Sequence, residues 1–405
     1  MPNYVDLNFP TAKAKDDGKS EWAVWATGFR PFFLGGALLA ALSIVAWLAI
    51  FLEGISVGGP ISPIDWHAHE MVFGFTPAII AGFLLTAVPK WTRVPTPTGK
   101  MLAALFSLWV LGRVAMALAE FLPYAAVAAA DLLFLPALAI AIAIPIGRAM
   151  TPRNLGFIPL LFGLAIANAL FHLDYLGVID GWAATSLDAA LGIIIVIIAI
   201  VGGRVIPFFT ANATGMPAIS RRRPMDFVAL GLTVAWLIAF IIDVTATWTA
   251  GLAMAAGAAN LARMKGWGIT RSLSIPLLWV LHAGYAFVGI GLVAFGLSHF
   301  DITGTRSIAI HALTTGAIGV LCLGMMARVA LGHTGRKLKA HKFTTIAFAL
   351  IVAAAIVRVF LPWAFAGAYA ESLVVSGTLW TVAWALFLFV YTPILLRPRA
   401  DGKPG

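Results

Sequence analysis

Long apolar segments alternate with short polar ones along almost the whole chain. A helix that crosses the hydrocarbon core of a bilayer needs about 20 mostly apolar residues. Segments of that kind can be marked at residues 29–52, 66–88, 101–120, 122–147, 154–177, 185–208, 225–243, 246–263, 274–298, 307–331, 343–361 and 370–396. The pattern predicts an all-α polytopic membrane protein of about 12 transmembrane helices. We expect one transmembrane domain over residues 28–396, between an N-terminal tail (1–27) and a C-terminal tail (397–405).

The composition excludes a soluble globular domain. The chain has 405 residues, of which 61% are hydrophobic and only 11% charged, whereas about a quarter of the residues in a soluble domain are charged. The formal net charge of +10 does not indicate a nucleic-acid partner, because the basic residues are dispersed among loops. The lipid bilayer is the expected partner.

The loop charges predict the orientation in the membrane. Every second loop and both tails are basic, with Lys90, Arg93, Lys100, Arg148, Arg153, Arg221, Arg222, Arg223, Arg263, Lys265, Arg271, Arg336, Lys337, Lys339, Lys342, Arg397, Arg399 and Lys403. The opposite loops hold Glu53, Asp65, Glu120, Asp174, Asp180, Asp243, Asp301 and Glu371, and a single basic residue, Arg306. Basic loops stay on the cytoplasmic side, so both termini are predicted to be cytoplasmic. The first apolar segment lacks a small-residue cleavage site, so no signal peptide is expected.

Candidate chemistry is concentrated where the second predicted span begins, in Asp65-Trp66-His67-Ala68-His69-Glu70-Met71. Ionisable groups are costly in hydrocarbon and therefore indicate function. His172 and His311 fall at a similar depth on two other spans, which predicts one outer layer of four histidines. The chain has one cysteine, Cys322, so a thiolate cluster is excluded. Imidazole without thiolate suits copper, zinc and iron, including haem iron.

The spacing within this motif predicts which groups meet. Residues three apart on a helix are neighbours, so Glu70 is expected beside His67 while His69 points elsewhere. This favours two adjacent centres, or one centre with a supporting group. The H-E-x-x-H arrangement of zinc hydrolases is absent, because Phe73 stands at the place of the second histidine. His282 and His333 lie nearer the cytoplasm and indicate either a second, inner centre or an architectural role.

Four arginines also lie within predicted spans. Arg204 and Arg328 fall near cytoplasmic ends, where their side chains can extend to the membrane surface. Arg113 and Arg358 fall toward the outer ends. For these two we expect a buried partner, such as a haem propionate, Asp131 or Glu70.

Spans 2, 6 and 10 end in similar sequences, at residues 86–92, 204–210 and 328–334. One interpretation is three pseudo-repeats of four helices. The other is that apolar sequences resemble one another through composition alone. A threefold repeat would make the fold similar to the twelve-helix haem-copper oxidases, by analogy at fold level.

Several motifs together resemble the NnrS family, over residues 28 to about 396. They are Gly28–Phe33, Trp66–Met71 with Phe73–Phe75, Gly82–Pro89 with Trp91-Thr92, Phe171-His172, Gly202–Thr210, Leu281–Ala286, His311–Leu313, Met325–Arg328 and Leu331–Arg336. Lys90 and Arg93 depart from the family pattern, on a loop away from the histidine layer.

The resemblance implies a bacterial inner-membrane protein that contains haem b and copper and is tied to nitric oxide metabolism and resistance to nitrosative stress. Joined to the histidine layer, it predicts reduction of NO to N2O near the periplasmic side. The sequence does not identify the electron donor, for which a quinol and cytochrome c are the candidates. His67, His69, His172 and His311 are then the predicted metal ligands, and Glu70 the proton-delivering group. His282 and His333 are predicted haem ligands, with Arg113 and Arg358 as haem propionate partners.

Two other functions remain open from the sequence. A sensor or scavenger would bind NO without turnover. A secondary transporter would fit twelve spans with internal repeats, and it predicts no bound metal and tolerance of histidine substitution.

Overall fold

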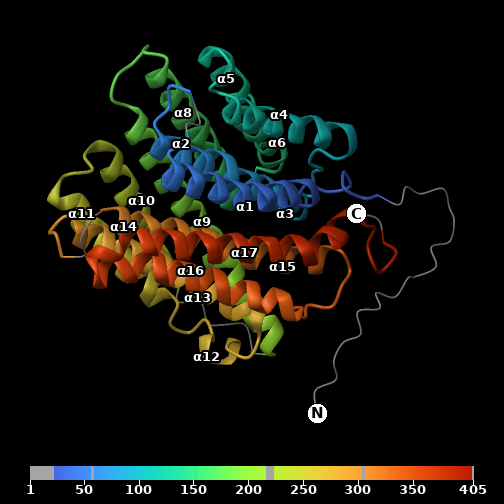
Figure 1. Ribbon diagram of the computed structural model, residues 1–405. Helices are drawn as coiled ribbons and strands as arrows, with labels where there is room; N and C mark the ends of the chain where they lie inside the picture. The colour runs from blue at the N-terminus through green and yellow to red at the C-terminus, as the bar shows by residue number, and fades with distance from the viewer. Residues whose placement is uncertain (1–21, 56–58, 151, 216–222, 303–305, 404–405) are drawn as a thin grey trace.

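The computed structural model describes residues 22–55, 59–150, 152–215, 223–302 and 306–403, and all regular structure within them is helical (Figure 1). The expectations for the N-terminal tail up to residue 21, and for Arg221 and Arg222, lie outside the described residues. In chain order the helices are α1 (Phe29–Glu53), α2 (Pro63–His69), η1 (Glu70–Phe75), α3 (Thr76–Thr92), α4 (Gly99–Ala117), α5 (Tyr124–Asp131), α6 (Phe134–Ala149), α7 (Pro152–Leu155), α8 (Phe157–Tyr175), α9 (Ala183–Thr214), α10 (Arg223–Ile242), α11 (Thr247–Arg263), α12 (Ile269–Ser272), α13 (Pro276–Ser298), α14 (Arg306–His311), η2 (Ala312–Gly319), α15 (Val320–His333), α16 (Lys342–Ala364), η3 (Ala366–Ala368) and α17 (Tyr369–Leu396).

The predicted polytopic architecture is confirmed. Eleven helical stretches among the described residues are long and apolar enough to cross a membrane. The predicted span at 246–263 is also a helix, α11, which packs against α10 and α13 but has only 17 residues. The chain is therefore a multi-pass membrane protein, and the count of about 12 holds when α11 is included.

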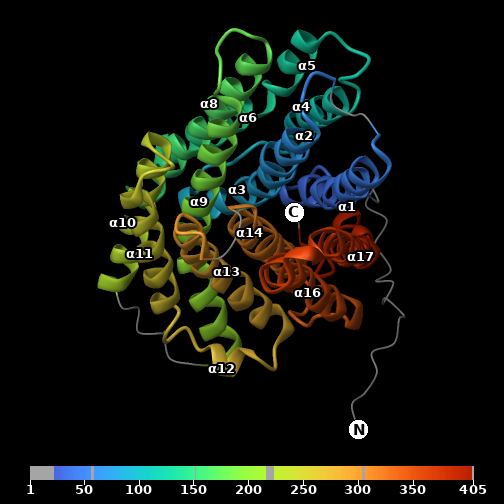
Figure 2. The same ribbon diagram turned by 60° about the vertical axis from the view of Figure 1, so that its left-hand side comes forward.

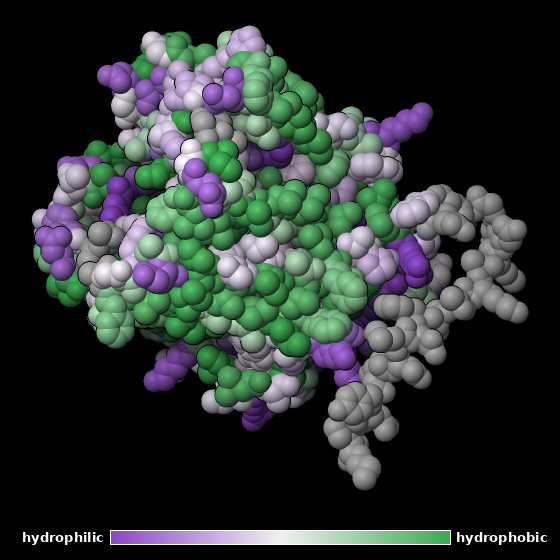
Figure 3. Space-filling view, viewed as in Figure 1, coloured by the Kyte–Doolittle hydropathy of each residue, from purple (hydrophilic) through white to green (hydrophobic). Residues whose placement is uncertain are grey.

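Burial separates central helices from peripheral ones. In four spans, Pro63–Thr92, Ala183–Thr214, Pro276–Ser298 and Arg306–His333, 67–72% of the most apolar window is buried, against 33–44% in the other seven. Figure 2 shows α3, α9, α13 and α14 near the centre of the bundle. Peripheral helices present apolar side chains outward instead. Figure 3 shows a broad hydrophobic area over α1, α16 and α17, with hydrophilic residues gathered toward its left and right ends, as a lipid-facing surface requires.

Two central spans contain a π-helical segment, and each segment begins directly after a histidine. η1 follows His69, and η2 follows His311. At the end of η1 the Thr76 amide donates to the Met71 carbonyl, five residues back. π-Segments inside α-helices are rare and frequently mark functional sites. They also change which residues share a face, so α-helical spacing does not hold through these turns.

The predicted span at 122–147 is divided by a break. α5 ends at Asp131 and α6 begins at Phe134. The break leaves Asp131 at the end of a short helix, buried inside the bundle.

The two ends of the described chain meet at one end of the bundle. The Ala23 amide donates to the Leu396 carbonyl at 2.8 Å. Beyond α17, Arg399 donates to the His333 carbonyl at 2.9 Å and to the Asp401 carboxylate, which lowers the pKa of Asp401 to about 2. The start of span 2 lies at the opposite end of the bundle, where α1 also ends.

Candidate functional site

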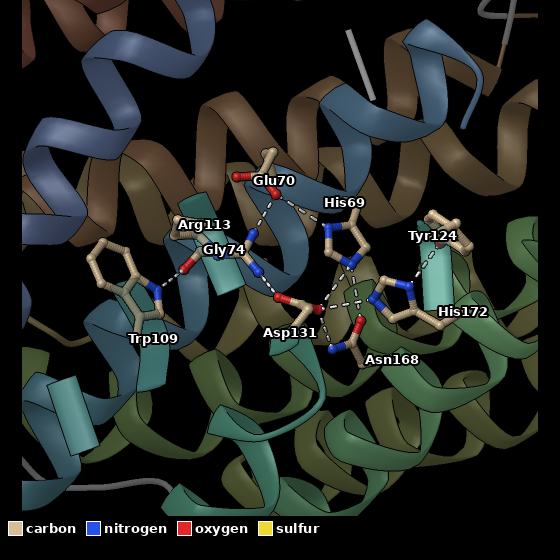
Figure 4. Close-up of polar contacts among 9 residues, drawn as sticks. All are labelled: His69, Glu70, Gly74, Trp109, Arg113, Tyr124, Asp131, Asn168 and His172. Atoms are coloured by element: carbon tan, nitrogen blue, oxygen red, sulfur yellow. Dashed lines mark hydrogen bonds and ion pairs between the residues drawn. The ribbon is translucent and has the colours of Figure 1, made fainter. Parts of the chain in front are cut away.

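Three side chains from separate helices meet in the bundle interior (Figure 4). His69 lies at the end of α2, Asp131 at the end of α5 and His172 on α8, and all three are buried. One potential ligand atom from each lies within 4.8 Å of the other two. We call these three residues the histidine–aspartate cluster.

The orientation of both imidazoles suits a metal site. Their Nε2 atoms face Asp131 Oδ2, at 3.4 Å for His69 and 3.0 Å for His172. Their Nδ1 atoms face away, toward Glu70 Oε1 at 3.3 Å and the Tyr124 hydroxyl at 2.8 Å. Metal-ligating histidines usually bond through one nitrogen while the other is held by a carboxylate, carbonyl or hydroxyl. The cluster therefore has the side chains that could ligate a metal ion and the groups that would orient them.

Asn168 completes the cluster's polar surroundings. Its Nδ2 donates to Asp131 Oδ2 at 2.8 Å, and its Oδ1 lies 3.0 Å from His69 Nε2. Together with the two imidazoles, this amide satisfies Asp131 Oδ2 from several sides. A buried carboxylate needs such partners to remain in hydrocarbon.

Arg113 on α4 bridges the two acidic residues. Its Nη1 pairs with Glu70 and its Nη2 with Asp131, and all three side chains are buried. Two carboxylates against one guanidinium leave one negative charge without a balancing cation when the histidines are neutral. Because an unbalanced buried charge is costly, the electrostatics favour a cation at the cluster, either a bound metal ion or a second proton on His69, whose two ring nitrogens both face side-chain oxygens.

Two glycines make room for this ion-paired group. A Cβ on Gly112 would lie 2.7 Å from Asp131 Oδ1, and a Cβ on Gly74 would lie 2.7 Å from Arg113 Nη1. The Gly74 carbonyl also accepts a hydrogen bond from the Trp109 indole at 3.0 Å. Larger residues at either glycine would displace the charged groups.

The expected position of Glu70 beside His67 is wrong. The Glu70 carboxylate contacts His69 and Arg113, while the His67 ring stacks on Trp47, with 4.7 Å between ring centroids. Glu70 is the first residue of η1, so the three-residue rule fails there. Its side chain also turns toward the guanidinium, which is the strongest available partner.

The expected single layer of four histidines is in fact two separate sites. His67 and His311 line a cavity of about 390 Å³ that also contacts Asp188, Arg306 and Arg358. We call it the histidine cavity. His69 and His172 do not line it. Side chains that are two residues apart on a helix point in different directions, so α2 supplies one histidine to each site.

Each histidine of the cavity has a ring nitrogen without a hydrogen-bond partner among the described residues. His311 Nδ1 donates to the Ser307 carbonyl at 2.7 Å, which leaves Nε2 as the nitrogen with the lone pair. His67 Nδ1 is buried and has no hydrogen-bond partner among the described residues.

The structure places the other predicted residues away from both sites. His282 Nε2 lies 3.1 Å from the Thr210 hydroxyl, and His333 Nδ1 lies 3.0 Å from Lys90 Nζ at the opposite end of the bundle. Neither lines the histidine cavity or contacts the cluster. Arg204 donates to the Arg153 carbonyl at 2.7 Å, and Arg328 lies over the Phe209 ring.

Residues 23–399 match the family model described as NnrS protein. The chain belongs to the NnrS family. This family is linked to the response to nitric oxide. A search of curated proteins finds no match. The matched region contains all the residues of the cluster and the cavity, so both sites lie in the part of the chain that makes it an NnrS protein.

The sequence interpretation missed three polar residues of the site. The sequence predicts Asp131 only as a partner of an arginine, and it predicts no role for Asn168 or Tyr124. Asp131 and Asn168 did carry a signal, because each is a polar residue inside an otherwise apolar predicted span. The position of Tyr124 at the start of such a span is typical of interfacial anchoring and gave no such indication.

Proposed function

We propose that this chain is a haem b- and copper-containing protein of the bacterial inner membrane that reduces nitric oxide to nitrous oxide. Its place would be in defence against nitrosative stress, with the site on the periplasmic side and both termini in the cytoplasm. The observation that carries the proposal is the buried histidine–aspartate cluster, which has the side chains of a metal site and pairs two carboxylates with one guanidinium inside an NnrS-family membrane protein.

The reaction balances as two NO, two electrons and two protons giving one N2O and one water. A quinol or a cytochrome c would supply the electrons. When bound, haem iron and copper would supply the redox-active centres for this two-electron reduction.

The donor set fits these groups. Two imidazoles and a carboxylate in the cluster suit copper, as well as zinc or iron, and His67 and His311 offer further imidazole nitrogens. The residues and helices around the cluster would orient the ligands and keep water out. Glu70 and Tyr124 orient the imidazoles through Nδ1, and the surrounding helices exclude water.

Glu70 is the residue proposed to transfer protons. It is buried, it contacts His69, and Arg113 holds its carboxylate in place. Positioned acids and bases typically contribute about 100- to 10,000-fold to rate. Nitric oxide is an uncharged gas that partitions into lipid, so the apolar helices around the site offer no barrier of charge to its entry.

The first test measures composition and turnover on the detergent-purified chain. We expect haem b by pyridine haemochrome, copper by mass spectrometry, and anaerobic NO consumption with matching N2O formation when a reductant is supplied. A colourless, metal-free protein after expression with iron, copper and haem precursor would overturn the proposal.

Glu70→Gln separates turnover from binding alone. It replaces the carboxylate that would take up and release a proton with an amide of the same shape, and Arg113 keeps Asp131 as its ion-pair partner. We expect NO consumption to fall by about 100-fold or more with haem and copper retained. Glu371→Gln, at an exposed position, is the matched control and should retain full activity. Stoichiometric NO binding without N2O in the unaltered chain would instead indicate a sensor or scavenger.

A further inference from the structure

The histidine cavity differs chemically from the histidine–aspartate cluster. Its walls are mainly apolar, with Trp47, Phe75, Ile318 and Trp380 among them. Its volume of about 390 Å³ falls within the roughly 300–1,000 Å³ of pockets that hold small molecules and cofactors. A single metal ion would leave most of this space empty.

Two imidazoles enter this cavity from different spans. His67 comes from the start of span 2, where Trp47 of α1 fixes its ring by stacking, with 19° between the ring planes. His311 comes from α14, and its hydrogen bond to the Ser307 carbonyl fixes the tautomer in which Nε2 carries the lone pair. A backbone carbonyl that holds the other ring nitrogen is the usual support of an imidazole ligand.

The cavity also holds a cation that needs an anionic partner. Arg306 is neutralised by an ion pair with Asp188. Arg358 is 5% exposed, and its Nη2 donates to the Tyr369 hydroxyl at 3.0 Å, but its Nη1 is buried without a hydrogen-bond partner among the described residues. A guanidinium in this condition would bind a carboxylate through charge-assisted hydrogen bonds.

An apolar cavity with two imidazoles and one unsatisfied guanidinium suits a planar, apolar macrocycle that carries an iron and carboxylates. We infer that the histidine cavity binds the haem, with His67 and His311 as iron ligands and Arg358 as the partner of a propionate. The histidine–aspartate cluster would then bind the copper. The inference relies on the proposed function for the identity of the two cofactors, and on the structure for their assignment to separate sites.

This assignment gives span 2 a specific role. His67 serves one cofactor and His69 the other, so the two centres sit on different faces of one helix. The backbone between these two residues would join the centres by a short covalent path. The assignment also agrees with the positions of His282 and His333 away from both sites, because the haem would need neither residue as a ligand.

The test measures cofactor content and spectra, independently of NO turnover. His67→Ala and His311→Ala are purified beside the unaltered chain, with haem measured by pyridine haemochrome and copper by mass spectrometry. Each is expected to lose haem, or to shift the remaining haem from a low-spin to a high-spin spectrum, while copper is retained. Added imidazole should restore the low-spin spectrum in both variants, since it can fill the space of the missing side chain. In Arg358→Gln, haem should be bound more weakly but with an unchanged iron spectrum.

The reciprocal variants and controls make the outcome decisive. His172→Ala should lose copper and keep haem, whereas His299→Ala, a histidine in an exposed position at the same end of the bundle, should change neither. His282→Gln and His333→Gln should keep the haem. Loss of haem in either of these two, with a normal spectrum in His67→Ala, would overturn the assignment.

Retained copper shows that a haem-depleted variant is folded. Equal loss of both cofactors in His67→Ala and His172→Ala would mean one shared site and would also overturn the inference. Failure of the proposed function looks different: the unaltered chain would then lack the cofactors or leave NO unconsumed.

Discussion

At the scale of single residues, charge balance explains most of the site. Glu70, Arg113 and Asp131 form a buried chain of two carboxylates and one guanidinium. Removing different members should therefore have different consequences, because a buried charge without a partner costs far more than a neutral group of the same shape.

Asp131→Asn should abolish copper binding without a comparable loss of stability. It removes the carboxylate that faces both imidazoles, but it leaves Glu70 and Arg113 as a balanced pair. We expect copper affinity to fall by more than the roughly 10- to 100-fold that follows loss of a supporting group. Metal analysis after dialysis checks this, and Asp180→Asn, an exposed residue near the same end of the bundle, is the control.

Arg113→Gln should instead lower the stability of the folded protein. Two buried carboxylates would then lack their only guanidinium, at a cost of about 3–5 kcal/mol. Thermal unfolding of the metal-free protein in detergent measures the loss. The double change Glu70→Gln with Arg113→Gln should recover part of it, because a single carboxylate remains. If the double variant proved less stable than Arg113→Gln alone, charge balance would not be the cause.

At the scale of helices, close approach and irregular turns bring the site together. α4 and α5 meet where Gly112 faces Asp131, and η1 meets α4 where Gly74 faces Arg113. The break between α5 and α6 and the π-turn after His69 place two charged residues where regular helices would not.

Gly112→Ala tests this packing. The new Cβ would lie 2.7 Å from Asp131 Oδ1, and overpacking of this kind costs about 1–3 kcal/mol. We expect a lower melting temperature and a lower copper content. Gly231→Ala on α10 is the matched control, because its Cβ would meet no atom within 4 Å. There the alanine should be neutral or stabilising by up to about 1 kcal/mol.

At the scale of the whole molecule, topology determines which side of the membrane the sites face. Both ends of the described chain lie at one end of the bundle, and the two histidine sites lie at the other. In the orientation that we propose, with the basic loops in the cytoplasm, nitric oxide chemistry would take place near the periplasmic surface.

Cysteine labelling tests that orientation. The chain has one cysteine, so Cys322→Ala gives a cysteine-free background. In this background, Asp180→Cys should react with a membrane-impermeant maleimide in intact spheroplasts, whereas Lys339→Cys should react only after permeabilisation. Both positions are exposed, so burial cannot explain a difference. The opposite pattern would place the sites in the cytoplasm.

The sequence by itself determined the membrane class, nearly all of the spans and the histidines of the site. Hydrophobic length and loop charge are local properties, and histidines within apolar runs are visible without a fold. The sequence also separated His67 from His69, because helical periodicity is local too.

Only the tertiary structure decided which groups meet. Asp131, Asn168 and Tyr124 come from helices that are distant in sequence from His69. Glu70 contacts His69 and Arg113, whereas the sequence predicts it beside His67. The meeting of Glu70, Arg113 and Asp131 beside the cluster depends on a π-turn, a helix break and two glycine contacts. The periodicity of apolar residues predicts none of these features. Each results from packing between helices, whereas the periodicity describes one helix at a time.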